Sequence, residues 1–293
     1  MRAAFAEIVD YAGLFPPASC SMEQAVKQYD EYRKSTDRWM LGRFVVAAIR
    51  LEEMTEVVTR LGIQPNPDDP WRLSVVMGAL IADELARIAQ FQAAWQGRGI
   101  IADSVEYRVS SVGQVRVVAE QIPAHFRRFF EVPLATLPDG LVGEIGLAGA
   151  FAKIRTGGTT ADLFPTVPDL VRFLGEAARH KVPFKATAGL HHPLRGGYPL
   201  TYDVHSEHVL MYGFVNLLLA TAEFIRGGED ETAEAILDEQ FARVFVRDGA
   251  DIRWRGVRFT AQELAVAHQQ LFLGFGSCSF REPVDELGLG VNV

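Results

Sequence analysis

The feature that most constrains the fold of this chain is a regular alternation of two kinds of segment. Eight short runs rich in β-branched or aromatic residues are candidate strands, at residues 6–13, 42–49, 71–78, 103–110, 126–134, 150–158, 182–190 and 213–220. Longer amphipathic stretches with helical spacing lie between them. This alternation indicates right-handed βαβ units, and eight units predict a closed (β/α)8 TIM barrel of the α/β class. An open doubly wound sheet is the alternative, but the sequence lacks the glycine-rich phosphate turn typical of its first strand.

The length of the chain leaves room beyond a minimal barrel. It has 293 residues, and a (β/α)8 barrel takes about 250. We therefore expect a single barrel at residues 1–245, with a long loop at 191–208 after the seventh strand. A C-terminal extension at 246–293 would pack on the barrel or on a neighbouring subunit. We also expect a homo-oligomer, with Phe272, Phe275 and Phe280 at a subunit contact, although their spacing fits core packing equally well.

Composition excludes several classes of partner. The net charge is −8 and no Lys/Arg cluster offsets it, so nucleic acid is not an expected partner. The longest apolar run in the C-terminal half covers residues 209–222, whereas a membrane span needs about 20 residues, so we expect no membrane association. Glu7 and Asp10 interrupt any signal-like segment, and two cysteines make no disulfide framework. We expect a soluble cytoplasmic protein.

Charged side chains late in the candidate strands predict the site. Barrel enzymes work at the C-terminal ends of their strands, and alternate residues of a strand share a face. Three acids and four bases occupy such positions: Asp10, Glu106, Glu131, Arg108, Lys153, Arg155 and Lys185. Because buried charge is costly unless paired, they predict a mixed-charge pocket with surplus positive charge. A structural salt bridge, for example between Lys153 and Glu131, is the alternative interpretation.

Several of these residues lie in segments that resemble the deoxyribose-phosphate aldolases, a family of class I (Schiff-base) aldolase barrels. IVDYAGLFPPAS is similar to I-D-H-T-L-L-x-P-x-A-T, ADSVEYRVS to A-D-E-V-D, and RRFFEVPLATL to a fifth-strand segment that ends in Glu. FAKIRTGG resembles F-x-K-T-S-T-G, and PFKATAGL resembles V-K-x-S-G-G-I. The resemblance runs in order along most of the chain and leaves out the segment after about residue 246.

The resemblance implies a lyase that forms a Schiff base with a small carbonyl substrate. It places Lys153 on the Schiff-base lysine, Lys185 on the second lysine, Glu106 in place of a catalytic aspartate, and Asp10 on the N-terminal aspartate. An amine attacks a carbonyl only when unprotonated, so Lys185 and Arg155 would lower the pKa of Lys153. Glu106 and Asp10 would move protons. This route needs no metal and no cofactor, and the residues alone do not decide which lysine is the nucleophile.

Departures from the family pattern point away from deoxyribose phosphate itself. If residues 213–220 form the eighth strand, its end reads Gly213-Phe214-Val215-Asn216, a poor phosphate cradle. Arg155 replaces a small residue and suits a carboxylate, so we expect a smaller oxo acid, a hydroxy-aldehyde or a differently charged carbonyl compound. Together with the charged groups above, the expected substrate-binding residues are Arg155, Arg108, Glu131, Thr156, Gly157, Thr187, Gly189, His191, Arg195 and Asn216.

Two other classes of function remain open. A metal-dependent barrel lyase or hydrolase would bring His191, His192, His205 and His208 near Asp10, Glu106 and Glu131. The histidine spacing matches no compact metal motif. A catalytically inactive barrel that binds a ligand or a partner is the other alternative, although an inactive site has no physical need for buried charge.

Overall fold

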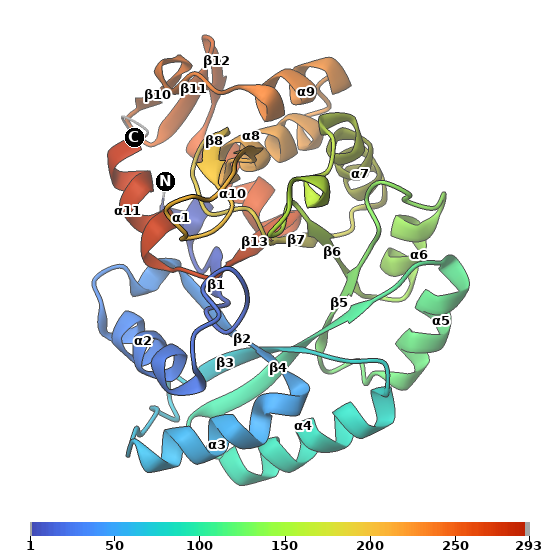
Figure 1. Ribbon diagram of the computed structural model, residues 1–293. Coiled ribbons are helices and arrows are strands. Elements are labelled where there is room, and N and C mark those ends of the chain that lie inside the picture. The colour runs from blue at the N-terminus through green and yellow to red at the C-terminus, as the bar shows by residue number, and fades with distance from the viewer. Residues whose placement is uncertain (1, 291–293) are drawn as a thin grey trace.

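The computed structural model describes residues 2–290 and contains a closed parallel barrel of eight strands (Figure 1). Seven strands follow in chain order: β1 (Val9–Tyr11), β2 (Leu41–Ala47), β3 (Trp71–Val76), β4 (Ile100–Arg108), β5 (Arg127–Glu131), β6 (Phe151–Arg155) and β7 (Phe184–Thr187). The eighth, β13 (Phe272–Ser277), pairs with both β7 and β1 and closes the ring. The predicted TIM barrel is therefore confirmed.

Helices surround the barrel on its outer side (Figure 1). Those that follow the first six strands are α2 (Met22–Lys34), α3 (Leu51–Arg60), α4 (Ile81–Trp95), α5 (Val112–Gln121), α6 (Leu141–Leu147) and α7 (Val167–His180). Later in the chain come α8 (Phe214–Ile225), α9 (Asp230–Asp238), α10 (Ala261–Gln270) and α11 (Arg281–Gly290), and α1 (Arg2–Phe5) precedes β1. Short 3-10 turns occupy Arg38–Met40, Ala48–Arg50, Ala161–Leu163 and Ala242–Val244. None of the described helices is long and apolar enough to cross a membrane.

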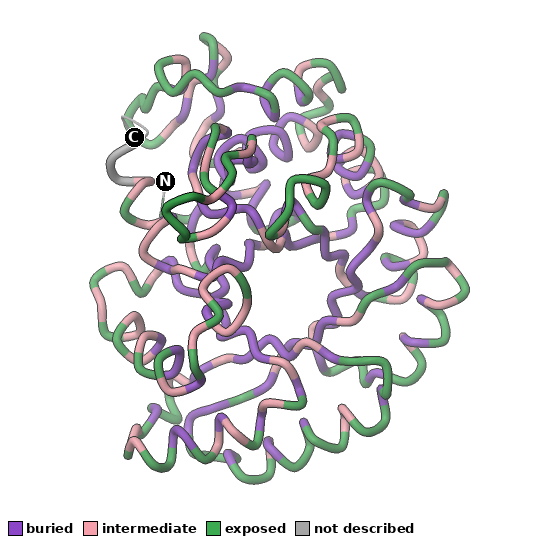
Figure 2. Tube along the Cα trace, viewed as in Figure 1, coloured by how far each residue is buried: buried purple, intermediate pink, exposed green. Residues whose placement is uncertain are grey.

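Local sequence signals explain where several helices begin. Capping boxes, in which a hydroxyl and a side chain three residues later each satisfy a backbone N–H, start α2 at Ser21, α7 at Thr166 and α10 at Thr260. The inward face of α7 buries apolar side chains such as Phe173 and Leu174. The barrel strands are almost continuously buried (Figure 2), as expected for a parallel sheet covered by helices.

The predicted eighth strand is wrong. Residues 213–220 form the first part of α8, in which every residue from Phe214 to Glu223 is buried. An apolar run that is buried on all sides lacks helical periodicity, so it cannot be distinguished from a buried strand by pattern. The true eighth strand, β13, lies inside the predicted extension at 246–293, so the boundary at 245 cuts through the barrel; residues 291–293 of that extension lie outside the described part.

Two small sheets lie outside the ring of barrel strands. The long loop predicted at 191–208 contains an antiparallel hairpin of β8 (Gly196–Pro199) with β9 (His208–Met211). A second sheet of β10 (Phe245–Asp248), β11 (Asp251–Trp254) and β12 (Val257–Phe259) lies between α9 and α10 in the chain.

The aromatic residues expected at a subunit contact belong to the core of the chain itself. Phe272, Phe275 and Phe280 are all completely buried. Phe275 stacks on Phe214 of α8 with ring centroids 4.9 Å apart, and Phe272 stacks on Phe184 of β7 at 5.5 Å. These stacks hold the last strand in the barrel, so core packing is the correct interpretation of their spacing.

We expect Phe275→Ala to lower the free energy of unfolding of the whole barrel by about 3–5 kcal/mol, the usual effect of removing a buried aromatic ring. Urea denaturation followed by circular dichroism measures it. Leu147→Ala, at an 85% exposed position of α6, is the control and should change the free energy by no more than about 0.5 kcal/mol. A barrel of unchanged stability in Phe275→Ala would contradict the role of β13 in closure.

Candidate active site

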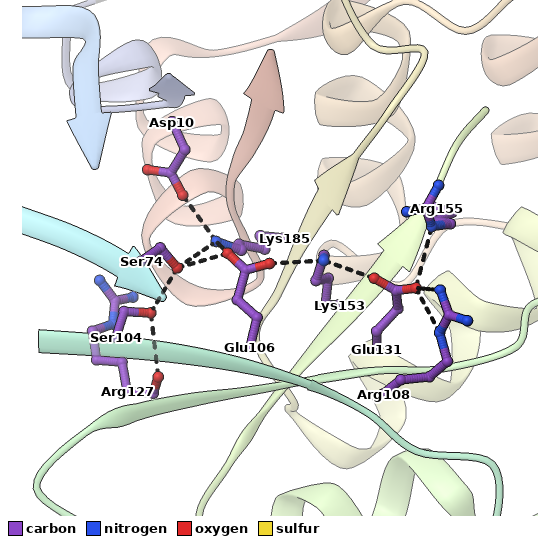
Figure 3. A network of polar contacts seen from close by, with 10 residues as sticks. All are labelled: Asp10, Ser74, Ser104, Glu106, Arg108, Arg127, Glu131, Lys153, Arg155 and Lys185. Carbon is purple, nitrogen blue, oxygen red and sulfur yellow. Dashed lines mark hydrogen bonds and ion pairs between the residues drawn. The ribbon is translucent and has the colours of Figure 1, made fainter. Parts of the chain in front are cut away.

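A cavity of about 550 Å³ opens at the C-terminal ends of the barrel strands. Strand register brings the charged residues to one level: Glu131 pairs with Lys153, and Lys153 with Lys185, on adjacent strands. Glu106 of β4 and Asp10 of β1 also point into the barrel (Figure 3). Glu106, Glu131 and Lys153 line the cavity, whereas Lys185 and Asp10 are not among its lining residues.

These side chains form a continuous series of ion pairs with alternating charge (Figure 3). Lys153 Nζ lies 2.7 Å from an oxygen of Glu106 and 2.7 Å from an oxygen of Glu131. Lys185 Nζ contacts the other oxygen of Glu106 and lies 3.0 Å from Asp10 Oδ2. Glu106 is therefore shared by two lysines. All four of these charged groups at the centre, Lys153, Lys185, Glu106 and Glu131, are buried.

Polar and aromatic neighbours hold the side chain of Lys185 in place. Ser74 Oγ accepts a hydrogen bond from Lys185 Nζ at 3.1 Å and donates one to Glu106 at 2.6 Å. The Lys185 ammonium also lies 4.7 Å from the centroid of the Phe129 ring, a cation–π distance. Asp10 is held in turn by the backbone N–H of Arg43, at 2.7 Å. Lys185 and Asp10 thus contact the lining residue Glu106 or its partners without lining the cavity themselves.

The electrostatics hold the central groups in their charged forms. Burial alone would raise the pKa of Glu106, but attraction to Lys153 and Lys185 outweighs it and lowers that pKa well below its usual range. The pKa of Glu131 is also lowered, because Lys153, Arg155 and Arg108 outweigh the effect of burial. Burial acts to lower the pKa of Lys153, yet the carboxylates of Glu106 and Glu131 raise it. The expectation of a lowered pKa for Lys153 is wrong, because two carboxylates contact its ammonium directly.

Two arginines lie at the outer end of the network. The side chain of Arg155 is 46% exposed and that of Arg108 is 75% exposed, and both line the cavity. Arg155 Nε donates to Glu131 Oε1 at 3.2 Å, and Arg108 donates to the same oxygen through Nε and Nη2. Among the described residues, the structure gives Arg155 no other ion pair. Its guanidinium therefore has donors that face the mouth of the cavity.

The residues that follow β6 and β7 divide into lining and packing groups. Thr187, Gly189 and His191 line the cavity as predicted. Thr156 and Gly157 do not: the Thr156 hydroxyl donates to the carbonyl of Ala188 at 2.7 Å and ties the two strand ends together. A Cβ on Gly189 would lie 2.9 Å from Cα of Gly157, so these glycines allow two backbones to pack closely.

Two predicted substrate-binding residues lie away from the cavity. Asn216 is buried in α8, where its side chain accepts from Arg195 N at 3.0 Å and donates to backbone carbonyls at Ile236 and Glu239. The Arg195 guanidinium lies 4.4 Å from the Tyr212 ring centroid and beside a separate cavity. Both predictions rested on the misplaced strand and on the loop folding inward, and both are wrong about the site.

The true eighth strand supplies residues that the sequence interpretation missed. It ends in Gly276-Ser277 and is followed by Cys278, and Gly276 and Cys278 line the cavity. His191 Nδ1 lies 3.0 Å from Ser277 Oγ and 3.9 Å from Cys278 Sγ. Burial, assisted by His192, lowers the pKa of His191 to about 4, so its imidazole is neutral at pH 7. The phosphate argument based on residues 213–216 does not apply, because those residues begin a helix.

His192, His205 and His208 lie outside the cavity that Glu106 and Glu131 line, whereas His191 lines it. His192 lies 2.8 Å from Glu286 and stacks on Tyr198, and His205 and His208 belong to the exposed hairpin region. Within residues 2–290 no group of three or more His, Cys, Asp or Glu side chains is arranged to hold a metal ion. The metal-dependent alternative therefore has no support from the geometry.

Comparison with known proteins does not assign this chain to a family. The sequence matches no protein-family model, and it matches no curated protein. The fold and the site thus define a (β/α)8 barrel with two buried lysines that share a glutamate near the C-terminal ends of its strands.

We expect Glu106→Gln to lower the free energy of unfolding at pH 7 by roughly 3–5 kcal/mol, because both lysines lose their shared counter-ion. The folded-state pKa of Glu106 lies below the unfolded value of 4.5, so its stabilisation is complete above pH 4.5 and is lost as the pH falls. Urea titrations from pH 7 to pH 3 should show a shallower acid slope in Glu106→Gln than in the wild type. Glu52→Gln, at an exposed position, should leave the slope unchanged, and equal slopes in all three proteins would contradict the assignment.

Proposed function

We propose that this protein is a carbon–carbon lyase of the class I aldolase type, in which Lys153 forms a Schiff base with a small carbonyl substrate. The observation that carries the proposal is a buried lysine that lines a cavity between two carboxylates, each 2.7 Å from its Nζ. The resemblance of FAKIRTGG to the Schiff-base lysine segment of deoxyribose-phosphate aldolases supports the choice of Lys153. So does the position of Lys185, which does not line the cavity.

The first half of the reaction needs two proton carriers beside Lys153. The Lys153 ammonium gives a proton to Glu106, and the free amine attacks the carbonyl carbon, so that a C–N bond forms and the carbonyl oxygen receives the π electrons. Glu106 returns its proton to that oxygen. The amine nitrogen then releases a second proton through Glu131, and the hydroxyl leaves as water with it, giving the iminium ion. The protein supplies the two bases within hydrogen-bond reach of the reacting nitrogen.

The second half breaks the carbon–carbon bond. A base removes the proton of the hydroxyl group on the carbon β to the iminium carbon. The Cα–Cβ bond then cleaves, and the hydroxyl oxygen becomes the carbonyl oxygen of the released aldehyde. The bond's electron pair moves into the iminium, giving an enamine and a released aldehyde. Protonation of the enamine and hydrolysis then free Lys153. Lys185 contacts the Glu106 carboxylate, and Asp10 positions Lys185.

Arg155 favours an anionic carbonyl compound as the substrate. Its guanidinium lies at the mouth of the cavity on the same strand as Lys153, two residues further on. A guanidinium binds a carboxylate through paired hydrogen bonds, which a lysine does not do. An oxo acid is therefore the substrate class that we propose.

We expect borohydride treatment with a panel of aldehydes, ketones and 2-oxo acids to produce a substrate-dependent mass gain on the intact protein. The adduct should be absent in Lys153→Met and present in Lys185→Arg, which keeps the second cation. Peptide mapping locates the modified lysine. No adduct with any compound in folded wild-type protein would overturn the proposal, and loss only in the Lys185 variant would reassign the nucleophile.

We expect adduct formation to become faster as the pH rises from 6.5 to 9, because deprotonation of Lys153 by solvent then adds to the transfer of its proton to Glu106. The pKa of Lys153 is raised by its two carboxylates, so the free amine is scarce at neutral pH and becomes more abundant as the pH increases. Glu131→Gln removes one carboxylate and leaves Arg108 and Arg155 near the amine. Its profile should shift to lower pH, because one of the two carboxylates that raise the pKa of Lys153 is gone; an unshifted profile would contradict the role of Glu131.

A further inference from the structure

The lining of the active-site cavity is divided into a charged side and an apolar side. Every ionised lining residue lies on β4, β5 or β6: Glu106, Arg108, Glu131, Lys153 and Arg155. The loop after β1 and the ends of β2 and β3 contribute Phe15, Pro16, Pro17, Val45, Val76 and Met77. Three more apolar side chains come from the segments after β6 and β7: Leu163, Leu200 and Met211. Such a surface matches a ligand with one polar end and one apolar end.

The charged lining residues Lys153 and Arg155 follow one another along β6, from the buried to the exposed end of the network. Lys153 and Arg155 are two residues apart on β6, which separates their positions by about 6.6 Å along the strand. Lys153 is buried, whereas the Arg155 side chain is nearly half exposed. In Figure 3 the two arginines lie at the end of the network opposite Asp10. A carbonyl at Lys153 and an anion at Arg155 would therefore belong to one molecule.

The apolar side is larger than a three-carbon substrate requires. The cavity volume of about 550 Å³ is in the range of sites that enclose drug-sized ligands. Leu163 is 42% exposed at its edge, and Phe15 is only partly buried. Apolar surface gains free energy when a ligand removes it from water, and the polar groups of a triose would bring no such gain.

We propose that the substrate of this site is an oxo acid with an apolar chain or ring of several carbons, which packs against apolar lining residues that include Phe15, Met77 and Leu163 while its carboxylate pairs with Arg155. The carbonyl part of this assignment rests on the proposed lyase function. The prediction of an apolar chain beside the carboxylate rests on the residues that line the cavity. It can be tested with compounds that have no carbonyl group.

Two measurements separate these parts. Calorimetry with unreactive saturated carboxylates of three to eight carbons reports the fit of the cavity. We expect the dissociation constant to fall with each added methylene, by up to about fourfold at full burial, until the cavity is filled. Borohydride trapping with 2-oxo acids of the same chain lengths reports the chemistry, and the yield at fixed concentration should rise along the series.

Matched variants assign the effect to the two sides. Leu163→Gln should reduce the dependence of the dissociation constant on chain length. Arg155→Gln should weaken the binding of every carboxylate in the series by a similar factor and leave that dependence in place. Leu147→Gln replaces an apolar residue that is 85% exposed and not part of the cavity, so its series should match the wild type. Thermal melting confirms that each variant is folded.

The outcomes are distinct. Affinity that rises with chain length in the wild type and not in Leu163→Gln supports the inference, even if no adduct forms and the lyase proposal fails. Affinity that is independent of chain length, or strongest for the three-carbon compound, overturns the inference, even if trapping succeeds with short oxo acids and the lyase proposal stands. A chain-length dependence that persists in Leu163→Gln and Met77→Gln also overturns it, because the apolar portion then binds elsewhere.

Discussion

The site depends on one carboxylate that serves two ammonium groups. Glu106 of β4 contacts Lys153 of β6 and Lys185 of β7, strands that are not its neighbours in the barrel. Buried charges are tolerated only when each is paired, so the position of Glu106 dictates where both lysines lie. Lys185 also reaches Ser74 of β3 and Asp10 of β1. The polar interior therefore links strands across the barrel, in addition to the backbone ladder that links neighbours.

The same pairing sets the resting state of the proposed nucleophile. An ammonium between two carboxylates is stable and unreactive, and the free amine exists only after a proton has moved to one of them. Because Glu131 also contacts Arg108 and Arg155, an anion that draws these guanidiniums away would leave Glu131 a stronger base. Substrate binding at the mouth and proton release at Lys153 are thus electrostatically connected.

The sequence pattern predicted most of the fold and the central charges, for physical reasons that also explain its failures. The alternating segments located seven of the eight strands. Because parallel strands of a barrel end at the same face, charged residues late in those strands were expected to lie close together. The eighth strand, β13, contains Gly274 and Gly276 and has a weak strand pattern, whereas the fully buried α8 imitated one. Asn216 and Arg195 were misplaced as a result. The pKa of Lys153 was misjudged because register across strands, which brings both glutamates to 2.7 Å, is not visible in one segment.

Closure of the barrel joins the first strand of the chain to one near its end. β1 pairs with β13, and His268 Nε2 lies 2.8 Å from the carbonyl oxygen of Ala6. During synthesis on a ribosome, residues 2–260 would emerge with β1 and β7 unjoined and with Phe214 lacking its stacking partner. Lys185 and Asp10 lie on the two strands that β13 joins, so before closure they would be exposed to water. The nascent chain therefore carries no enclosed candidate site until β13 has been synthesised and has joined β7 to β1.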